Sequence, residues 1–185
     1  PNYREYYENR WFASGIDMVG LEVELAGECV PFGTDLIFAA SDLPDFVFHI
    51  ELCEDFWAAD PPSTQGALAG ALVLCNLSAS NIVVGKADDR VLLCASQSMR
   101  CHAAYVYSAA GPGESTTDLA WDGHATIHEL GVQLACTDRF PSQSQMAVAD
   151  VDVERLRLER MRTLTFNSAA AAAGHPETAF RRIAF

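Results

Sequence analysis

Short apolar runs alternate with amphipathic segments along most of this chain. Residues 46–52 are mainly aromatic and aliphatic, and such a run predicts a buried strand. Residues 86–102 carry apolar side chains at helical spacing, which indicates an amphipathic helix. The same reasoning predicts strands at 21–25, 29–32, 36–39, 73–77, 103–108, 126–130, 132–136 and 145–151, helices at 63–71 and 152–161, and a surface helix or linker at 168–174.

The order of these segments indicates the fold class. Strands and helices alternate after residue 46, with hairpins on either side that turn at Gly27 and at Gly131. The run 73–77 is almost wholly apolar, so we expect a central strand buried on both faces. Asp152 is a candidate cap for the helix that follows it. The pattern predicts one α/β layered domain, and 185 residues allow a substantial core.

Composition excludes some classes of function. The formal net charge is −13, whereas a nucleic-acid-binding protein needs a basic surface to neutralise phosphates. No apolar run has the length of a membrane span, and no signal segment opens the chain. We therefore expect neither nucleic acid nor a membrane as partner, and a cytoplasmic location. Because the chain starts at Pro1 without methionine and ends at Phe185 without a polar tail, we expect both ends to be cut from a longer protein.

Six cysteines are scattered along the chain, at positions 29, 53, 75, 94, 101 and 136. No pair has CxxC spacing, so neither a zinc knuckle nor a dithiol redox pair is indicated. A disulfide framework is not expected in a chain of this size without secretion signals. Cys75 lies inside an apolar run, and Cys94 and Cys101 share one face of the predicted helix. These three are expected to be small core side chains.

Cys53 has a different setting, directly after the strand 46–52 and before Glu54 and Asp55. The acidic pair and the prolines at 61 and 62 indicate a sharp turn, which is where a nucleophilic cysteine is commonly presented. A buried core thiol is the alternative. A nucleophile also needs a proton acceptor and groups that stabilise the thiolate and the oxyanion. His49 or His102 would provide a papain-like base, and a carboxylate with a lysine is the other solution.

The sequence does not match other common catalytic and binding motifs. His128 and Glu129 begin a zincin-like HExxH, but position 132 is valine, and the remaining histidines have no ligand spacing. The segment from Gly111 lacks the third glycine of a dinucleotide fingerprint, and no GKS or GKT occurs. No Gly-x-Ser-x-Gly elbow is present. The sequence therefore predicts no metal site and no nucleotide motif, and Cys53 stays the main candidate for chemistry.

Five blocks, in order along the chain, carry a resemblance to a known family. They are PNYREYYENRWF at 1–12, PFGTD at 31–35, HIELCED at 49–55, NLSAS at 76–80 and GESTTDLAWDG at 113–123. Over essentially its whole length the chain resembles the glutaminase domain of bacterial glutamine-dependent NAD⁺ synthetases, a branch of the carbon–nitrogen hydrolase (nitrilase) superfamily. Residues 1–185 correspond only to the later part of such a domain.

The resemblance implies a nitrilase-type α-β-β-α sandwich that hydrolyses L-glutamine to glutamate and ammonia through a cysteine thioester. The ammonia would pass to a C-terminal synthetase domain of the same polypeptide, which amidates ATP-activated deamido-NAD⁺. The glutaminase part needs no cofactor, whereas ATP and Mg²⁺ are implied for the synthetase domain. A homo-oligomer is expected for the full-length enzyme.

The resemblance also assigns roles to individual residues. Cys53 falls at the nucleophile, and Glu8 at a supporting glutamate; the general-base glutamate and the lysine are expected before residue 1. Lys86 falls where relatives may carry arginine. A solvated Lys86, and a Glu8 that only pairs with a nearby arginine, are the alternatives. The residues that fall where the family contacts glutamine are Tyr3, Glu54, Ser80 and Lys86.

The functional roles fit these residue types. Glu54 and Ser80 would bind the α-amino group of glutamine, and Lys86 its α-carboxylate. The backbone N–H of Glu54 would donate to the oxyanion. Two other hypotheses remain open: a stand-alone amidase or carbamoylase of the same superfamily, and a catalytically incomplete piece that serves only packing or assembly. If strands of a larger domain precede this chain, we expect it to expose apolar sheet surface.

Overall fold

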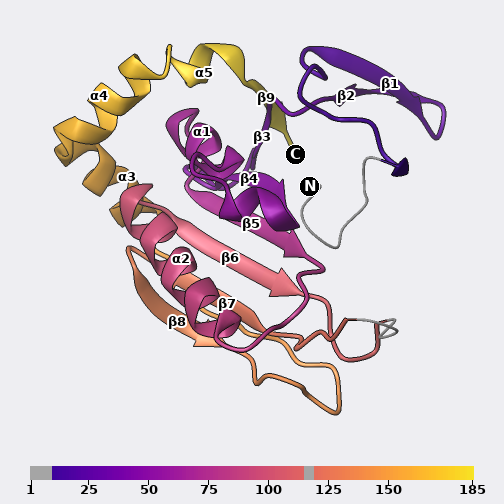
Figure 1. Cartoon of the computed structure of the whole chain (residues 1–185). Coiled ribbons are helices and arrows are strands. Elements are labelled where there is room, and N and C mark those ends of the chain that lie inside the picture. The colour runs from indigo at the N-terminus through magenta and orange to yellow at the C-terminus, as the bar shows by residue number, and fades with distance from the viewer. Residues whose placement is uncertain (1–9, 115–118) are drawn as a thin grey trace.

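The computed structural model describes residues 10–114 and 119–185, and a mixed sheet of seven strands lies at its centre (Figure 1). The strands lie in the order β8-β7-β6-β5-β4-β3-β9. Their bounds are β3 Leu36–Ala39, β4 Val47–Leu52, β5 Val73–Ser78, β6 Ala104–Ala109, β7 Ala125–Glu129, β8 Val132–Cys136 and β9 Arg181–Ala184. The predicted α/β class is confirmed.

The middle of the sheet is parallel and its flanks are largely antiparallel. β4 pairs with β5, and β5 with β6, in parallel registers that put Glu51 opposite Asn76 and Asn76 opposite Tyr107. β6, β7 and β8 form an antiparallel series, and β3 is antiparallel to β4. Parallel neighbours end at the same edge of a sheet, so the segments after β4, β5 and β6 begin close together.

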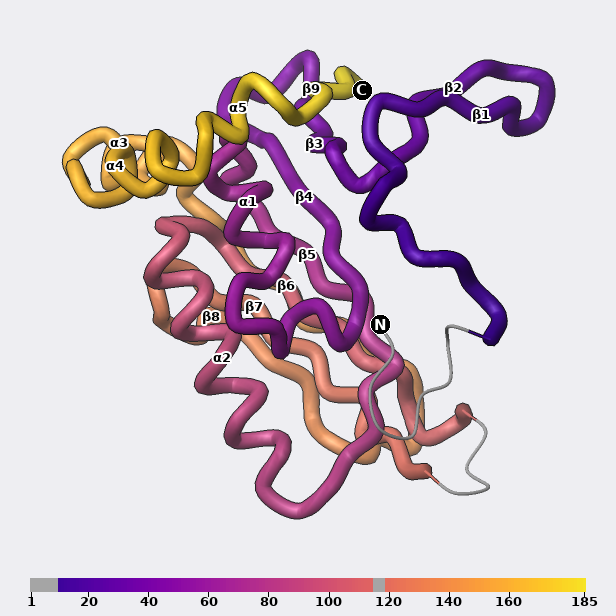
Figure 2. Tube along the Cα trace, turned by 45° about the horizontal axis from the view of Figure 1, so that its top comes forward, coloured from indigo at the N-terminus to yellow at the C-terminus, as the bar shows by residue number. Residues whose placement is uncertain are grey.

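Two helices cover one face of this sheet (Figure 2). α1 (Pro62–Leu68) connects β4 to β5, and α2 (Lys86–Arg100) connects β5 to β6. The close approach of α1 depends on a glycine, because a Cβ at Gly66 would overlap the His49 ring. Cys94 and Cys101 are buried beneath this layer, as predicted, and burial raises their thiol pKa values to about 12 and about 11.

The opposite face of the sheet is apolar and partly exposed. Ile50, Leu52 and Leu77 keep 40%, 52% and 55% of their surface accessible, although they lie on central strands. The expected uncovered apolar sheet surface is therefore present. The prediction that 73–77 is buried on both faces is wrong, because no second layer covers this side within the described ranges. Cys75 is accordingly half-buried instead of being a core residue.

Helix α3 (Val153–Arg162) closes the edge where the parallel strands begin. The predicted cap is confirmed, since the Asp152 carboxylate accepts the Arg155 N–H at 2.9 Å. Arg160 is buried, and burial lowers its pKa to about 10. Its guanidinium donates to four main-chain carbonyl oxygens, those of Ala67, Ala71, Cys101 and His102, at 2.6–3.2 Å. One side chain thus joins the ends of α1 and α2 to α3.

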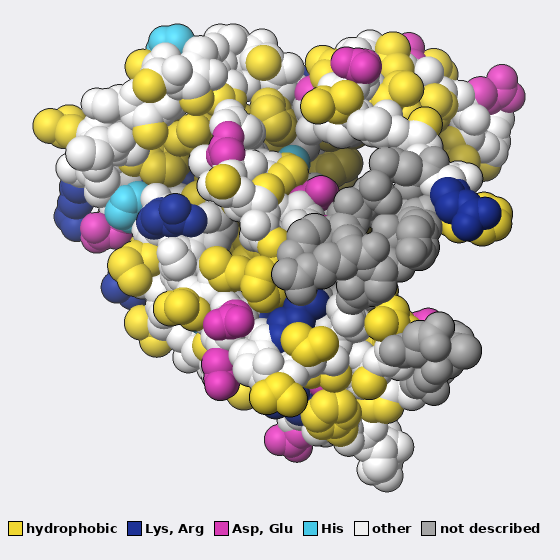
Figure 3. All heavy atoms as spheres, in the orientation of Figure 1, with side chains coloured by type: hydrophobic (Ala, Val, Ile, Leu, Met, Phe, Trp, Pro, Cys, Tyr) yellow, Lys and Arg dark blue, Asp and Glu magenta, His cyan; other side chains and the backbone are white. Residues whose placement is uncertain are grey.

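Two terminal features lie outside the central layers. β1 (Leu21–Leu25) and β2 (Glu28–Phe32) pair as the predicted hairpin, which stands apart from the sheet (Figure 1) and carries exposed hydrophobic side chains (Figure 3). Arg181 of β9 holds the two ends of this hairpin. It donates to the carbonyl oxygens of Leu21 and Phe32 and to the carboxylate of Asp35. Helices α4 (Leu164–Ala172) and α5 (Pro176–Ala179) follow α3, so the stretch 168–174 is mainly surface helix.

Two further differences from the sequence predictions concern strands. Residues 145–151 form no strand: the segment pairs with no described strand, and its side chains Met146 and Val148 are exposed. Strand β9 was not predicted. It is short and begins with two arginines, and only its parallel pairing with β3 makes it a strand. No described helix is long and apolar enough to cross a membrane.

We expect Arg160→Met to lower the free energy of unfolding by about 3 kcal/mol or more, because it removes a donor from four carbonyl oxygens, of which that of Ala67 keeps the Gly70 N–H. Arg162→Met is the matched control, since the Arg162 side chain is 71% exposed and, among the described residues, its ion pair is with Glu159. That variant should change stability by less than about 1 kcal/mol. Urea unfolding followed by circular dichroism measures both. Equal losses in the two variants would contradict the anchoring role of Arg160.

Candidate functional site

Cys53 lies where β4 ends and the 3₁₀ helix η2 (Cys53–Trp57) begins. Its backbone has φ of 49°, a left-handed conformation that costs a non-glycine residue about 1–2 kcal/mol. Non-glycine residues in this region are uncommon and cluster at functional sites. The thiol is half-buried. The predicted turn after the strand is therefore confirmed, and Cys53 is not a fully buried core residue.

A buried hydrogen bond network supports the strand that leads to Cys53. The carboxylate of Glu51, 2% exposed, accepts the Ser63 N–H at 2.8 Å and the Tyr105 hydroxyl. Burial, and then the Glu51 charge, raise the pKa of Tyr105 well above its usual value, so the phenol stays protonated and donates. The Ser63 hydroxyl accepts from Gln97 at 3.0 Å. Strand β4, helix α1 and helix α2 are thus tied together two residues before the cysteine.

On the neighbouring strand, Asn76 contacts the cysteine directly. Its side-chain Nδ2 donates to the carbonyl oxygen of Cys53 at 3.4 Å, and its Oδ1 accepts the Ser78 hydroxyl at 2.5 Å. Asn76 is 1% exposed, within a run predicted from its apolar character alone. Its side chain links the end of β4 to β5 at the edge where both strands finish.

The two histidines considered as bases do not reach this edge. His49 precedes Cys53 by four strand residues, about 13 Å at the usual rise. Its Nδ1 is 3.1 Å from the carbonyl oxygen of Leu36, and burial lowers its pKa. His102 precedes β6, at the opposite end of the parallel strands, where its ring packs against Phe166. A papain-like pair with Cys53 is therefore not formed.

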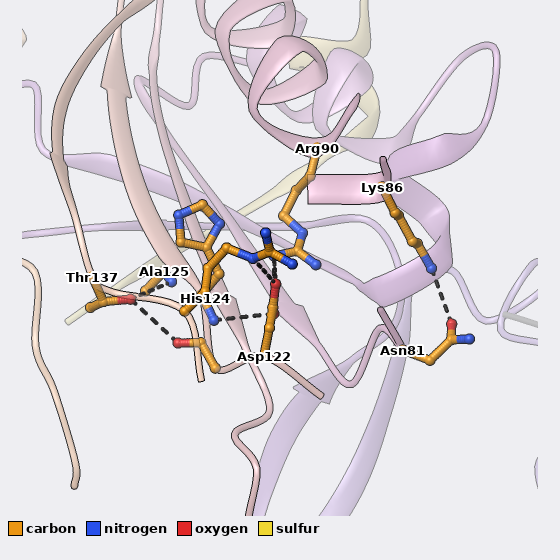
Figure 4. Close-up of polar contacts among 9 residues, drawn as sticks. Asn81, Lys86, Arg90, Asp122, His124, Ala125 and Thr137 are labelled. Carbon is orange, nitrogen blue, oxygen red and sulfur yellow. Dashed lines mark hydrogen bonds and ion pairs between the residues drawn. The ribbon is translucent and has the colours of Figure 1, made fainter. Parts of the chain in front are cut away.

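The loop after β5 brings two of the predicted residues to the cysteine edge. Ser80 is buried, and its hydroxyl has no hydrogen bond partner among the described residues. Lys86 begins α2, and its Nζ donates to Asn81 Oδ1 at 3.1 Å (Figure 4). The same Nζ lies 5.5 Å from the centroid of the Trp57 ring. Because Trp57 belongs to η2, this contact puts Lys86 beside the segment that starts at Cys53.

A buried ion pair joins helix α2 to the segment that precedes β7. Arg90 of α2 donates to both carboxylate oxygens of Asp122, at 3.0 and 3.1 Å, and both side chains are fully buried (Figure 4). Arg139 adds a second contact to Asp122 at 2.9 Å. Burial opposes ionisation of Asp122, but the Arg90 charge and these hydrogen bonds outweigh it and hold the pKa below its usual value. The Arg90 guanidinium also lies 5.2 Å from the ring centroid of Tyr107.

Sequence reasoning found part of this arrangement. Cys53, Glu54, Ser80 and Lys86 come from segments that follow β4 and β5 at one edge. Tyr3 and Glu8 lie outside the described residues. Four further residues were missed as parts of the site or its support: Asn76, Trp57, Arg90 and Asp122. Asn76 and Asp122 belong to blocks that carried the resemblance, so a polar residue inside an apolar run and an aspartate next to Gly123 were the available signals.

Comparison with known proteins gives the same family that the sequence blocks indicated. No family model matches the chain. The chain is 55% identical over all its 185 residues to the glutamine-dependent NAD⁺ synthetase of Mycobacterium tuberculosis, of which it covers 27%. It therefore spans about a quarter of the length of such relatives.

Solved structures agree with this assignment. The structure of a glutamine-dependent NAD⁺ synthetase from Cytophaga hutchinsonii matches with a TM-score of 0.60 and 27% identity, over 72% of this chain and 20% of that one. A carbon–nitrogen hydrolase from Helicobacter pylori matches with a TM-score of 0.57 and 16% identity, over 74% of this chain and 50% of that one, which supports the fold alone. The chain is thus a relative, over its whole length, of one part of the glutamine-dependent NAD⁺ synthetases, and it has the carbon–nitrogen hydrolase fold.

Proposed function

We propose that this chain forms part of a glutaminase in which Cys53 is the nucleophile. The observation that carries the proposal is the left-handed turn at Cys53, at the edge where parallel strands end and beside Lys86 and Ser80. The relatives named above are glutamine-dependent enzymes, which makes the side-chain amide of glutamine the bond to be cleaved.

The proposed reaction has two steps. The Cys53 thiolate attacks the amide carbon of glutamine, the C–N bond breaks, and ammonia leaves with the proton that a base has taken up. Water then attacks the thioester carbon, and glutamate leaves as the thiol is restored. The backbone N–H of Glu54 follows the nucleophile and donates to the oxyanion in both steps. The resemblance places the general-base glutamate and a lysine before residue 1, with Glu8 as a supporting glutamate.

Substrate recognition is assigned to the rim around Cys53. Glu54 and Ser80 bind the α-amino group, and the buried Ser80 hydroxyl has no described partner to displace. Lys86 binds the α-carboxylate. Asn81 and the Trp57 ring already hold its ammonium group at the rim, so less side-chain freedom is lost on binding. Tyr3 is assigned a substrate contact by the resemblance alone.

The larger activity follows from the relatives. Ammonia from this site is proposed to serve a C-terminal synthetase domain of the same polypeptide, where ATP and Mg²⁺ are used to amidate deamido-NAD⁺. Homo-oligomer formation also stays a prediction. A stand-alone amidase or carbamoylase of the same superfamily is the second candidate, because the carbon–nitrogen hydrolase fold does not by itself determine which amide is cleaved. Residues 1–185 on their own are proposed to be catalytically incomplete, because the resemblance places the general base before residue 1.

In the full-length protein, we expect Cys53→Ser to lower kcat for glutamine hydrolysis by about 10³-fold or more, because the alcohol is a much weaker nucleophile than the thiolate. Cys136→Ser, at an exposed cysteine, should leave kcat unchanged. Ammonia release measures both. NAD⁺ formation from added ammonium salt should survive Cys53→Ser; its loss would contradict the division between two active sites. Hydrolysis of other amides but not of glutamine would favour the amidase.

Lys86 is the single lysine of residues 1–185, so acetylation of lysine within this segment reports on Lys86 alone. We expect Lys86→Met to raise KM for glutamine about tenfold or more with little change in kcat, because a ground-state ion pair is lost. Lys86→Arg should retain most of the affinity. Glutamine should also slow acetylation of Lys86 by acetic anhydride, read by mass spectrometry. An unchanged KM in Lys86→Met would show that Lys86 does not bind the α-carboxylate.

A further inference from the structure

The backbone of Cys53 is held by a side chain from the neighbouring strand. Asn76 Nδ2 donates to the carbonyl oxygen of Cys53, whose own φ is 49°. In the parallel register Asn76 is the partner of Glu51, two residues before the cysteine. The contact therefore runs from the body of β5 to the residue at which β4 turns, and both ends of it are on regular elements instead of mobile loops.

The two partners of the Asn76 amide agree on its orientation. The Cys53 carbonyl oxygen can only accept, so the NH₂ group must face it, and the Ser78 hydroxyl donates to Asn76 Oδ1 at 2.5 Å, which holds the amide in that orientation. Ser78 in turn interacts with the Tyr107 phenol on β6, whose pKa burial raises to about 12. The phenol is therefore protonated at neutral pH. Three adjacent parallel strands, β4, β5 and β6, thus contribute to one connected set of polar groups that ends at the cysteine carbonyl.

We propose that Asn76 is a positioning residue for Cys53, and that it keeps the cysteine in the left-handed turn from which its thiol reacts. The inference rests on the proposed role of Cys53 as nucleophile. Asn76 does not act on the substrate itself. It acts by holding the Cys53 carbonyl against the end of β5, so that the thiol and the Glu54 N–H keep one relative geometry while the thioester forms and breaks.

A role in folding alone would give a different result. Many buried polar groups stabilise this protein, including the Ser98 hydroxyl, which donates to the carbonyl oxygen of Ala103 at 2.7 Å. Ser98 lies near the end of α2, before β6, so it is remote from the edge where Cys53 lies. Loss of either side chain removes one hydrogen bond to a main-chain carbonyl oxygen. Only loss of Asn76 changes the backbone of the nucleophile.

The test compares Asn76→Ala with Ser98→Ala in the full-length protein. We expect Asn76→Ala to lower kcat for glutamine at least tenfold and to change KM less than twofold, because the transition-state geometry is lost and the substrate contacts remain. The rate of Cys53 alkylation by iodoacetamide, followed by peptide mass spectrometry, should fall at least threefold. Ser98→Ala should change each quantity less than twofold, although both variants lose stability in urea.

Ser78→Ala is the second variant, since it keeps Asn76 and removes only the group that orients it. We expect a fall in kcat of about threefold, and this variant decides the question if Asn76→Ala does not fold. Unchanged kcat and alkylation in a folded Asn76→Ala protein would overturn the proposal, as would equal losses in Ser98→Ala. If the wild-type protein does not hydrolyse glutamine, the proposed function fails, while the alkylation rates still decide whether Asn76 positions Cys53.

Discussion

Parallel pairing of β4 with β5 determines where the described residues of the candidate site lie. A parallel pair needs a crossover, and α1 supplies it on one face of the sheet. Both strands then finish at the same edge, so the turn at Cys53 and the loop that carries Ser80 and Lys86 are neighbours. The buried carboxylate of Glu51 strengthens this arrangement, since it is bonded to the start of α1 and to Tyr105 of β6.

The two ends of the parallel strands differ in their polar contacts. At the end where they start, Arg160 collects four carbonyl oxygens and fixes α1, α2 and α3. At the end where they finish, the chain makes a strained turn at Cys53, and the buried Ser80 hydroxyl has no hydrogen bond partner in the part of the chain that the structure describes. Strain and unsatisfied polar groups cost stability and persist where the surrounding structure over-determines them. His102, at the end held by Arg160, is also left-handed, with φ of 44°, and Arg160 donates to its carbonyl oxygen.

Periodic segments were predicted well because their signal is local. The strand 46–52, the helix from Lys86 and the turn at Cys53 each follow from residues a few positions apart. Features that depend on distant residues left no such signal. Asp122 meets Arg90 across 32 residues of sequence, and nothing near either residue indicates the pair. Ser80 and Lys86 were found through the resemblance, because a serine in a polar loop and a lysine in a first helical turn are ordinary on their own.

Strand β9, near the end of the described residues, completes the edge of the sheet beside β3. Its pairing with β3, and the ion pair between Arg181 and Asp35, join residues 146 positions apart. During synthesis the outer edge of β3 therefore stays open until residues 181–184 have emerged from the ribosome. Open strand edges are templates for wrong pairing, and contacts between distant residues form slowly. Until β9 pairs with β3, that edge of the nascent sheet is open to wrong pairing.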